Sequence, residues 1–364
     1  MAFVYCSCDY NVTAVVDGVK EAIPGVPVLG NTSFTGVIVS DGGYVGGDEP
    51  FVGVMVLSSP EMAVGIAAAD RAQNDDPFEA GLIMAEAALD AAGKDVAPDF
   101  FYMAASPAEE ELYLKGISSV IGRVPFFGGS AADNSIAGEW KLYDTDESFG
   151  DGCVIALFWD APAMTNMFTG AYHETDDFGV ITKVNGLRTI AEIDGVPAAK
   201  KYQEGTGGNL LAYSITSPLG VKDRLGDLVA IRHPMNGNDD FTINVGNNLA
   251  EKTCVIRMEA TVDELIASVP DTLEALIDVM PGKPAAFHLV VAPVSTRASA
   301  RWPTPLPRSP ATCPTSWSSP SVNTDSNPTT TTRAAASCCR SRASANSTGF
   351  STEAIAESRR CHLD

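Results

Sequence analysis

Short apolar runs alternate with amphipathic stretches over the first half of the chain, which predicts strands alternating with helices. The apolar runs that predict strands lie at 3–7, 35–39, 51–57, 62–68, 99–104, 137–143, 152–159 and 164–171. Apolar residues at helical spacing predict helices over 11–22 and 107–121. A further helix is expected from Pro77 to Ala92, because proline favours a helix start and Gly93 favours a helix end.

The same pattern recurs within the chain at an offset of 98 residues. The aligned segments are 3–5 with 101–103, 26–30 with 124–128 and, at an offset of 102, 51–57 with 153–159. We therefore predict two similar α/β units, at about 1–75 and 99–175, related by a pseudo-twofold axis. The later strands of each unit follow one another too closely for helical crossovers, so we expect antiparallel neighbours within mixed sheets.

The repeat also bears on the start of the chain. Helix 77–92 precedes the second unit, but no equivalent helix precedes residue 3. We therefore expect a missing helix upstream of Met1, through a truncated or mis-assigned start.

Small and polar residues follow the second strand of each unit. The first copy has Gly30-Asn31-Thr32-Ser33, and the second has Gly128-Gly129-Ser130-Ala131-Ala132-Asp133-Asn134. Backbone N–H groups and hydroxyls at the carboxyl edge of a sheet favour a carboxylate or another small polar ligand. The alternative interpretation is that Gly30, Gly128 and Gly129 only permit tight turns. Neither loop has the glycine and lysine spacing of a nucleotide-binding loop.

The charge of the chain argues against polyanionic partners. The formal net charge is −22, so we expect no nucleic-acid partner and no anionic membrane surface. No long apolar run predicts a transmembrane helix, and the first residues have neither a basic region nor a cleavage pattern. We therefore expect a cytoplasmic protein.

The composition changes abruptly near Val294. Residues 1–294 contain 16 Lys and Arg against 42 Asp and Glu, whereas 295–364 contain 8 Arg, no Lys and 4 acidic residues. The tail also has 25 Ser and Thr, and it is too poor in Leu, Ile and Val to form a core. We expect 294–364 to be a disordered or out-of-frame tail, because a reading-frame shift in a GC-rich gene produces such a switch inside a domain. A genuine disordered linker is the alternative.

Residues that carry catalysis or bind metals are not arranged in a recognisable order. Cys6-Ser-Cys8 does not have the usual zinc spacing, and no ordering of Ser, His and Asp or of Cys and His stands out. We expect no catalytic residue, no metal site and no enzyme activity. A non-covalent haem would need an axial ligand, for which His173 beside Tyr172, and His233, are the candidates.

Several segments resemble a known family. Segments 26–38 and 124–134 resemble the N-terminal part of the FIST sensory domain. Segments similar to the end of that part and to the start of the FIST C-terminal domain follow at 180–182, 190–198, Tyr202, 217–221 and 231–234. The resemblance covers about residues 1–293.

The resemblance implies an architecture and a role. It implies a FIST N-terminal-like domain at 1–204 and a partial FIST C-terminal-like domain at 205–293, with strands expected at 228–233, 241–245 and 253–258 and a helix at 261–278. The fold class is then α/β (α+β mixed). The role implied is a signal-input module that binds a small ligand such as an amino acid. A histidine kinase, a chemotaxis receptor or a cyclic-dinucleotide enzyme would be its separate output partner.

The chain departs from the family pattern at three points. It carries Asn31 where many members have Cys, it has no output domain, and the family's terminal Gly-Phe…Gly-Glu segment is not found in 295–364. Some members resemble haem-binding nitric-oxide sensors, so haem sensing is one alternative function. A ligand-free interaction scaffold is another, and it would be favoured if no small molecule shifts the melting temperature.

These arguments give a set of expected ligand-binding residues. They are Asn31, Thr32, Ser33, Gly128, Gly129, Ser130, Asp133, Asn134 and Arg232. Arg232 is included because an arginine beside a predicted strand can hold a ligand carboxylate with two hydrogen bonds. The alternative for Arg232 is a salt bridge to one of the many acidic residues.

Overall fold

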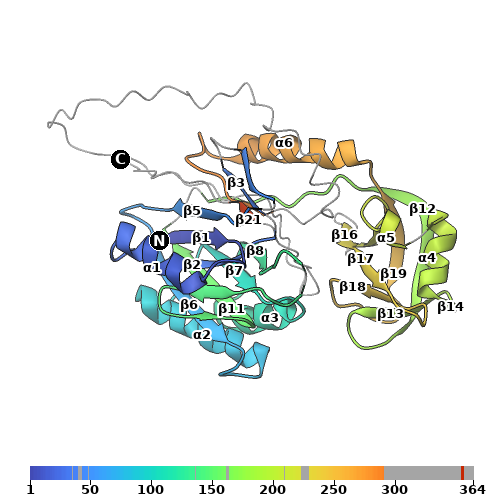
Figure 1. The fold of residues 1–364 in the computed structure, drawn as a ribbon, viewed down its shortest axis with the longest axis horizontal. Helices are drawn as coiled ribbons and strands as arrows, with labels where there is room; N and C mark the ends of the chain where they lie inside the picture. The colour runs from blue at the N-terminus through green and yellow to red at the C-terminus, as the bar shows by residue number, and fades with distance from the viewer. Residues whose placement is uncertain are drawn as a thin grey trace.

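The structure is a computed structural model that describes residues 1–34, 36–39, 43–47, 49–135, 137–160, 164–208, 210–222, 229–290 and 354–355. It has an N-terminal unit and a second unit beside it (Figure 1). Both combine helices with sheets of antiparallel or mixed strand direction, so the expected α/β class is confirmed.

Two sheets lie face to face in the N-terminal unit. The first, in the order β10-β9-β2-β1-β5, contains β1 (Ala2–Cys6), β2 (Val28–Thr32), β5 (Val52–Val56), β9 (Leu142–Asp144) and β10 (Ser148–Phe149). The second, in the order β6-β11-β7-β8, contains β6 (Ala63–Asp70), β7 (Phe100–Ala105), β8 (Phe126–Ser130) and β11 (Gly152–Trp159). In each sheet a parallel pair, β1–β2 or β7–β8, has an antiparallel neighbour, β5 or β11. The expected mixed sheets are therefore confirmed.

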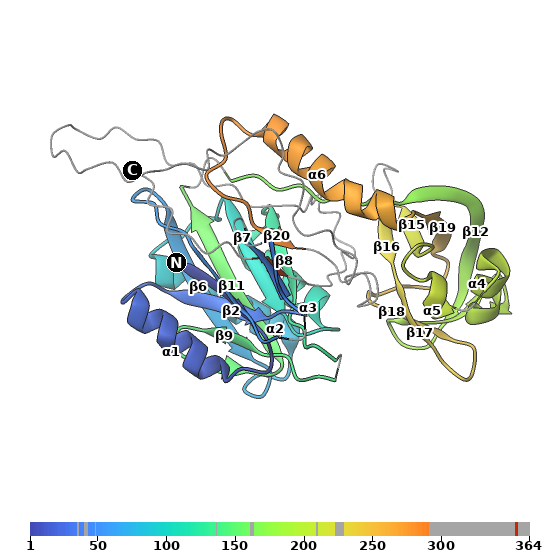
Figure 2. The same cartoon turned by 45° about the horizontal axis from the view of Figure 1, so that its top comes forward.

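Helices cover the outer faces of both sheets, so the unit has four layers (Figure 2). Helix α1 (Val12–Ala22) packs Val12 and Val16 against the first sheet, and α2 (Pro77–Ala92) and α3 (Glu110–Ile121) cover the second. The layer between the sheets is rich in aromatic side chains, namely Phe3, Tyr5, Phe51, Phe100, Tyr102, Phe127, Phe149 and Phe158. This layer is the main core of the unit.

Helix α2 begins and ends where the sequence predicts. The Asp76 side chain accepts hydrogen bonds from the first backbone N–H groups of the helix, and Gly93 ends it in the left-handed region with φ of 62°. These are the end signals that satisfy otherwise unpaired backbone groups.

The two halves of the sandwich correspond. The predicted offset of 98 holds for β2 and β8, where Leu29 and Phe127 both face the inter-sheet core, but the other strands need a one-residue correction to the alignment. Phe3 and Met55 face the inter-sheet core, as Tyr102 and Ala156 do, which requires offsets of 99 and 101. The predicted offsets of 98 and 102 would instead align Phe3 and Met55, which face the inter-sheet core, with Phe101 and Leu157, which face the helices. A one-residue shift reverses the face of every side chain, and hydropathy does not fix the register of β1 against β7 because both faces of these two strands are buried. The gene duplication itself stays a prediction.

One expected strand is absent. Residues 164–172 form no regular secondary structure, although their counterpart in the first unit forms β6. The strand β6 pairs with β11 in the second sheet. After β11 the chain leaves the sandwich and enters the second unit instead.

The second unit is built on one sheet in the order β16-β15-β19-β12-β13-β18-β17, with β14 beside β13. Its strands are β12 (His173–Val184), β13 (Thr189–Ile193), β14 (Val196–Pro197), β15 (Leu219–Lys222), β16 (Val229–Arg232), β17 (Pro234–Gly237), β18 (Ile243–Val245) and β19 (Cys254–Glu259). Helices α4 (Ala198–Thr206) and α5 (Leu210–Tyr213) pack on its core. The sheet takes strands from both sides of residues 204 and 205, so the division between sheets lies before β12.

Helix α6 (Val262–Val279) runs above both units and leads the chain back to the N-terminal unit (Figures 1 and 2). After it, β20 (Leu289–Val290) pairs with β21 (Ala354–Ile355), which lies near the hairpin of β3 (Gly36–Val39) and β4 (Gly43–Gly46). Apart from β21, the tail 294–364 lies outside the described residues. The expectation for it stays a prediction.

Two glycines permit the close approach of the parallel strands. A Cβ atom added to Gly30 would lie 1.8 Å from the Val4 carbonyl oxygen, and one added to Gly128 would lie 1.8 Å from the Met103 carbonyl oxygen. A backbone atom cannot move aside as the end of a flexible side chain can. The two glycines are therefore required inside strands, and they are not turn residues as the alternative interpretation held.

We expect Gly30→Ala and Gly128→Ala each to lower the free energy of unfolding by about 1–3 kcal/mol or more, as overpacking does. Gly18→Ala is the matched control, because Gly18 lies within α1 with no atom near its Cβ position. That change should raise stability by about 0.5–1 kcal/mol. Chemical denaturation measures all three, and equal effects at the three positions would contradict the argument.

Candidate functional site

Most of the buried polar residues gather at the carboxyl ends of the two parallel strand pairs. Those with almost no exposed surface are Ser7, Asn31, Thr32, Ser33, Ser106, Glu110, Glu111, Ser130 and Asp133. They follow or end β1, β2, β7 and β8, or begin α3. We call this group the carboxyl edge. Its hydroxyls, amide and carboxylates are the kind of groups that orient a small polar ligand.

The structure brings the two polar segments of the predicted site into direct contact. The Ala132 backbone N–H donates to the Thr32 carbonyl oxygen at 3.0 Å. The Asn134 amide donates to Asp9 Oδ2 at 2.9 Å and to Ser7 Oγ at 3.2 Å, beyond the end of β1. The internal repeat predicts only that the two segments lie at equivalent edges of two sheets. In the structure the two sheets face each other, so that these edges lie together.

The predicted loops are partly strands. Asn31 and Thr32 belong to β2, and Gly128, Gly129 and Ser130 belong to β8. Pairing with the neighbouring parallel strand extends each element past its glycine. Weak strand propensity is overridden there by the tertiary context.

Asp133 organises its own loop. Its carboxylate accepts hydrogen bonds from the backbone N–H groups of Ser135, Ala137, Gly138 and Glu139. Burial raises the pKa of the Asp133 carboxyl, but these N–H groups outweigh it, so that the pKa is below its usual value. Because both oxygens are already engaged, Asp133 shapes the edge and is poorly available to a ligand.

A line of hydrogen bonds crosses the core from the carboxyl edge to a histidine. The Tyr102 hydroxyl donates to Asn31 Oδ1 at 3.0 Å, and the Tyr5 hydroxyl donates to the Tyr102 oxygen at 3.2 Å. His288 Nε2 lies 2.8 Å from the Tyr5 oxygen. Since the Tyr5 proton is directed at Tyr102, Nε2 carries a hydrogen and donates it to Tyr5.

No pattern in the sequence assigns a role to His288. The structure buries it completely between the sheets of the N-terminal unit. Burial lowers its pKa to about 3, so the ring is neutral. No local pattern could have revealed this, because the histidine comes from a segment far along the chain.

An ion-pair cluster joins the carboxyl edge to the second unit. Arg188 donates to Glu110 Oε2 at 2.8 Å and also to Glu111, and it contacts the Asn248 side chain. The Ser130 hydroxyl donates to Glu110 Oε1 at 2.6 Å. Burial raises the pKa of the Glu110 carboxyl, and Arg188 and Ser130 only partly offset this. Glu110 therefore links a predicted site residue to the other unit.

Arg232 lies near this cluster and is almost completely buried. Burial lowers the pKa of its guanidinium to about 10, although the charge of Glu111 acts to raise it. The guanidinium donates to the Ile231 carbonyl oxygen at 3.0 Å. The sequence leaves two alternatives for Arg232, a contact with a ligand or an ion pair with an acidic residue. Either of them would involve this same cluster.

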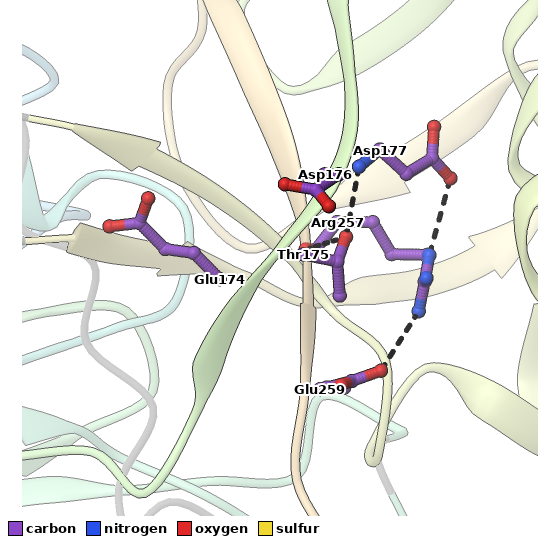
Figure 3. A pocket seen from close by; sticks show the side chains of 6 residues that line it. All are labelled: Glu174, Thr175, Asp176, Asp177, Arg257 and Glu259. Atoms are coloured by element: carbon purple, nitrogen blue, oxygen red, sulfur yellow. Dashed lines mark hydrogen bonds and ion pairs between the residues drawn. The ribbon is translucent and has the colours of Figure 1, made fainter.

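A shallow hollow lies on the second unit, and none of the predicted site residues lines it (Figure 3). It is lined by Glu174, Thr175, Asp176, Asp177, Arg257 and Glu259. Arg257 is paired with Asp177 at 3.2 Å and with Glu259 at 3.5 Å. With four carboxylates around one paired arginine, this hollow repels an anionic ligand. We therefore place the candidate site at the carboxyl edge.

The two haem candidates lie in different surroundings. His173 is largely exposed and lies 3.4 Å from Glu264. His233 Nδ1 lies 3.0 Å from the Ser214 carbonyl oxygen, and its ring packs on Tyr172. Within the described ranges, no group of three or more His, Cys, Asp or Glu could hold a metal ion, and Cys6, Cys8, Cys153 and Cys254 form no disulfide.

The family follows from comparison with known sequence domains. The model of the FIST N domain matches residues 1–196, which is more than half of the chain. The chain belongs to the FIST family. FIST is a sensory domain of signal-transduction proteins. The comparison with curated proteins gives no match.

The match places both strand pairs of the carboxyl edge inside the FIST N domain. It also extends through β12 and β13 of the second unit, so it includes Arg188. The helices among the described residues include none that is long and apolar enough to cross a membrane.

We expect Arg188→Gln to lower the free energy of unfolding of this FIST protein by about 3–5 kcal/mol, because it leaves two buried carboxylates without their partner. Arg257→Gln is the control, since its pairs are more exposed and should contribute about 1 kcal/mol or less. Adding Glu110→Gln to Arg188→Gln should restore part of the loss. Chemical denaturation measures these values, and similar losses for both arginines would contradict the assignment.

We expect His288 to make stability depend on pH. Its pKa is about 3 in the folded chain and near 6.5 when it is free, so below about pH 6.5 the unfolded chain binds a proton that the folded chain does not. The contribution of His288 to the free energy of unfolding is therefore fully present above about pH 6.5, and it is lost as the pH falls towards 3. His288→Phe should flatten the pH dependence of the free energy of unfolding over this range. The exposed His173→Gln is the control, and an unchanged slope in His288→Phe would refute the prediction.

Proposed function

We propose that the protein is a cytoplasmic signal-input module that binds a small ligand, an amino acid, at the carboxyl edge. It passes the signal to a separate output protein, a histidine kinase, a chemotaxis receptor or a cyclic-dinucleotide enzyme. The proposal is supported by the FIST N match and by the buried polar groups that converge where the two strand pairs end. Neither catalysis nor a bound cofactor is part of it.

The observation that carries the proposal is the pairing of acids and arginines beside these strands. Glu110 and Glu111 are paired with Arg188, and Arg232 lies close enough to Glu111 for the two charges to interact. A free amino acid carries one carboxylate and one ammonium group, which match an arginine and a glutamate respectively. The cluster therefore has both kinds of partner that such a ligand needs.

The same contacts offer a route for the signal. Glu110 is shared by Ser130 in the N-terminal unit and Arg188 in the second unit. A ligand that bonds to Ser130 or to either glutamate changes how strongly Arg188 is held. The position of the second unit would then change, and an output protein could recognise that change.

We expect at least one standard amino acid to raise the melting temperature of the full chain, because binding to the folded state adds stability. Ser130→Ala and Arg232→Lys should reduce or abolish that rise. Ser119→Ala is the matched control, since Ser119 is on the exposed face of α3 and its hydroxyl bonds within the helix. A rise that persists in both site variants would place the ligand elsewhere. No response to any small molecule would favour the interaction scaffold.

A further inference from the structure

His288 occupies a cage of aromatic rings in the core of the N-terminal unit. Its ring centroid lies 5.0 Å from that of Phe3, 5.4 Å from Tyr5, 5.9 Å from Tyr102 and 4.9 Å from Phe127. The Tyr102 ring is stacked on it, and the other three meet it at steep angles. We call these four rings the aromatic cage. All of them come from β1, β7 and β8.

The cage recognises a ring that carries an N–H group. The Tyr5 oxygen accepts from His288 Nε2, while the Tyr5 proton goes on to Tyr102 and the Tyr102 proton to Asn31. The line ends at the carboxyl edge, since the Asn31 amide donates to the same Thr32 carbonyl oxygen that accepts from Ala132. The cage and the edge are thus two ends of one polar line.

His288, which fills the cage, forms a hydrogen bond with only one of its two ring nitrogens among the described residues. His288 Nδ1 is fully buried and has no hydrogen-bond partner among the described residues. Buried polar atoms in cores are nearly always paired, so an unpaired one calls for an explanation. A histidine that only filled the core would be expected to have both nitrogens bonded.

The segment that carries His288 belongs to neither sheet of the sandwich. It follows α6, and within the described part of the chain the adjoining strand β20 pairs with β21 through Leu289 and Val290. Ala286 and Leu289 are the other buried residues of this segment. A short segment of this kind can leave at smaller cost than a central strand.

We propose that the aromatic cage is a binding pocket for an imidazole or similar N–H heteroaromatic ring, and that His288 is its tethered occupant. A free ligand with such a ring competes with residues 286–290 for the cage. This inference rests on the proposed function, because the tether gives His288 a high effective concentration and a competitor needs further contacts at the carboxyl edge. An amino acid with an imidazole side chain supplies both.

The chemistry of the cage is tested in His288→Ala, at an alkaline pH where imidazole is neutral. Imidazole should raise the melting temperature of this variant in a saturable way, and 1-methylimidazole should do so less, because its substituted nitrogen cannot donate to Tyr5. Adding Tyr5→Phe should remove the preference for imidazole. Met84→Ala is the control, since it opens the other core of this unit, in which Met84 is buried. Equal responses of the His288→Ala and Met84→Ala variants would overturn the proposal.

Competition is tested in the unaltered chain, so the test does not depend on whether His288→Ala folds. L-histidine, and not L-alanine, should reduce the hydrogen-exchange protection of residues 286–290. If L-histidine raises the melting temperature but leaves that protection unchanged, the ligand binds at the carboxyl edge alone, and only this inference fails. If L-histidine has no effect while another amino acid raises the melting temperature, the inference fails and the proposed function stands.

Discussion

The face-to-face packing of two sheets through an aromatic layer is the contact on which the rest of the molecule depends. Because β1–β2 and β7–β8 are buried on both faces, most side chains within them are apolar, and the polar ones, such as Asn31, Thr32 and Ser130, lie at their carboxyl ends. The facing sheets bring those ends together, as the contact between Ala132 and Thr32 demonstrates. The carboxyl edge is therefore a consequence of how the core is closed.

The polar groups of this edge differ in how strongly their neighbours in the protein already hold them. Asp133 is engaged by the backbone of its own loop, and Thr32 is engaged with Lys141. Glu110, in contrast, is held by side chains from both units, and its raised pKa reflects a burial that those partners do not fully offset. Groups with incompletely compensated burial are the ones that a ligand or a moving unit can influence.

The second unit is connected to the sandwich both by the chain and by side-chain contacts. The chain passes into it after β11 and returns through α6, and Arg188 clamps it to Glu110 and Glu111. The return path carries His288 into the aromatic core of the first unit. The position of the second unit is thus linked to the core of the sensory domain.

The sequence by itself determined the secondary structure where local signals agree, as in helix α2 between Asp76 and Gly93, and it determined the α/β class and the FIST resemblance. It also identified Asn31, Thr32 and Ser130 as neighbours of strand ends. It could not fix the register of β1 against β7, because strands buried on both faces have no alternation. Only the tertiary structure decided that Arg188 meets Glu110 and that His288 enters the aromatic cage. These pairs are far apart in the chain, and their contact follows from packing, which leaves no local pattern in the sequence.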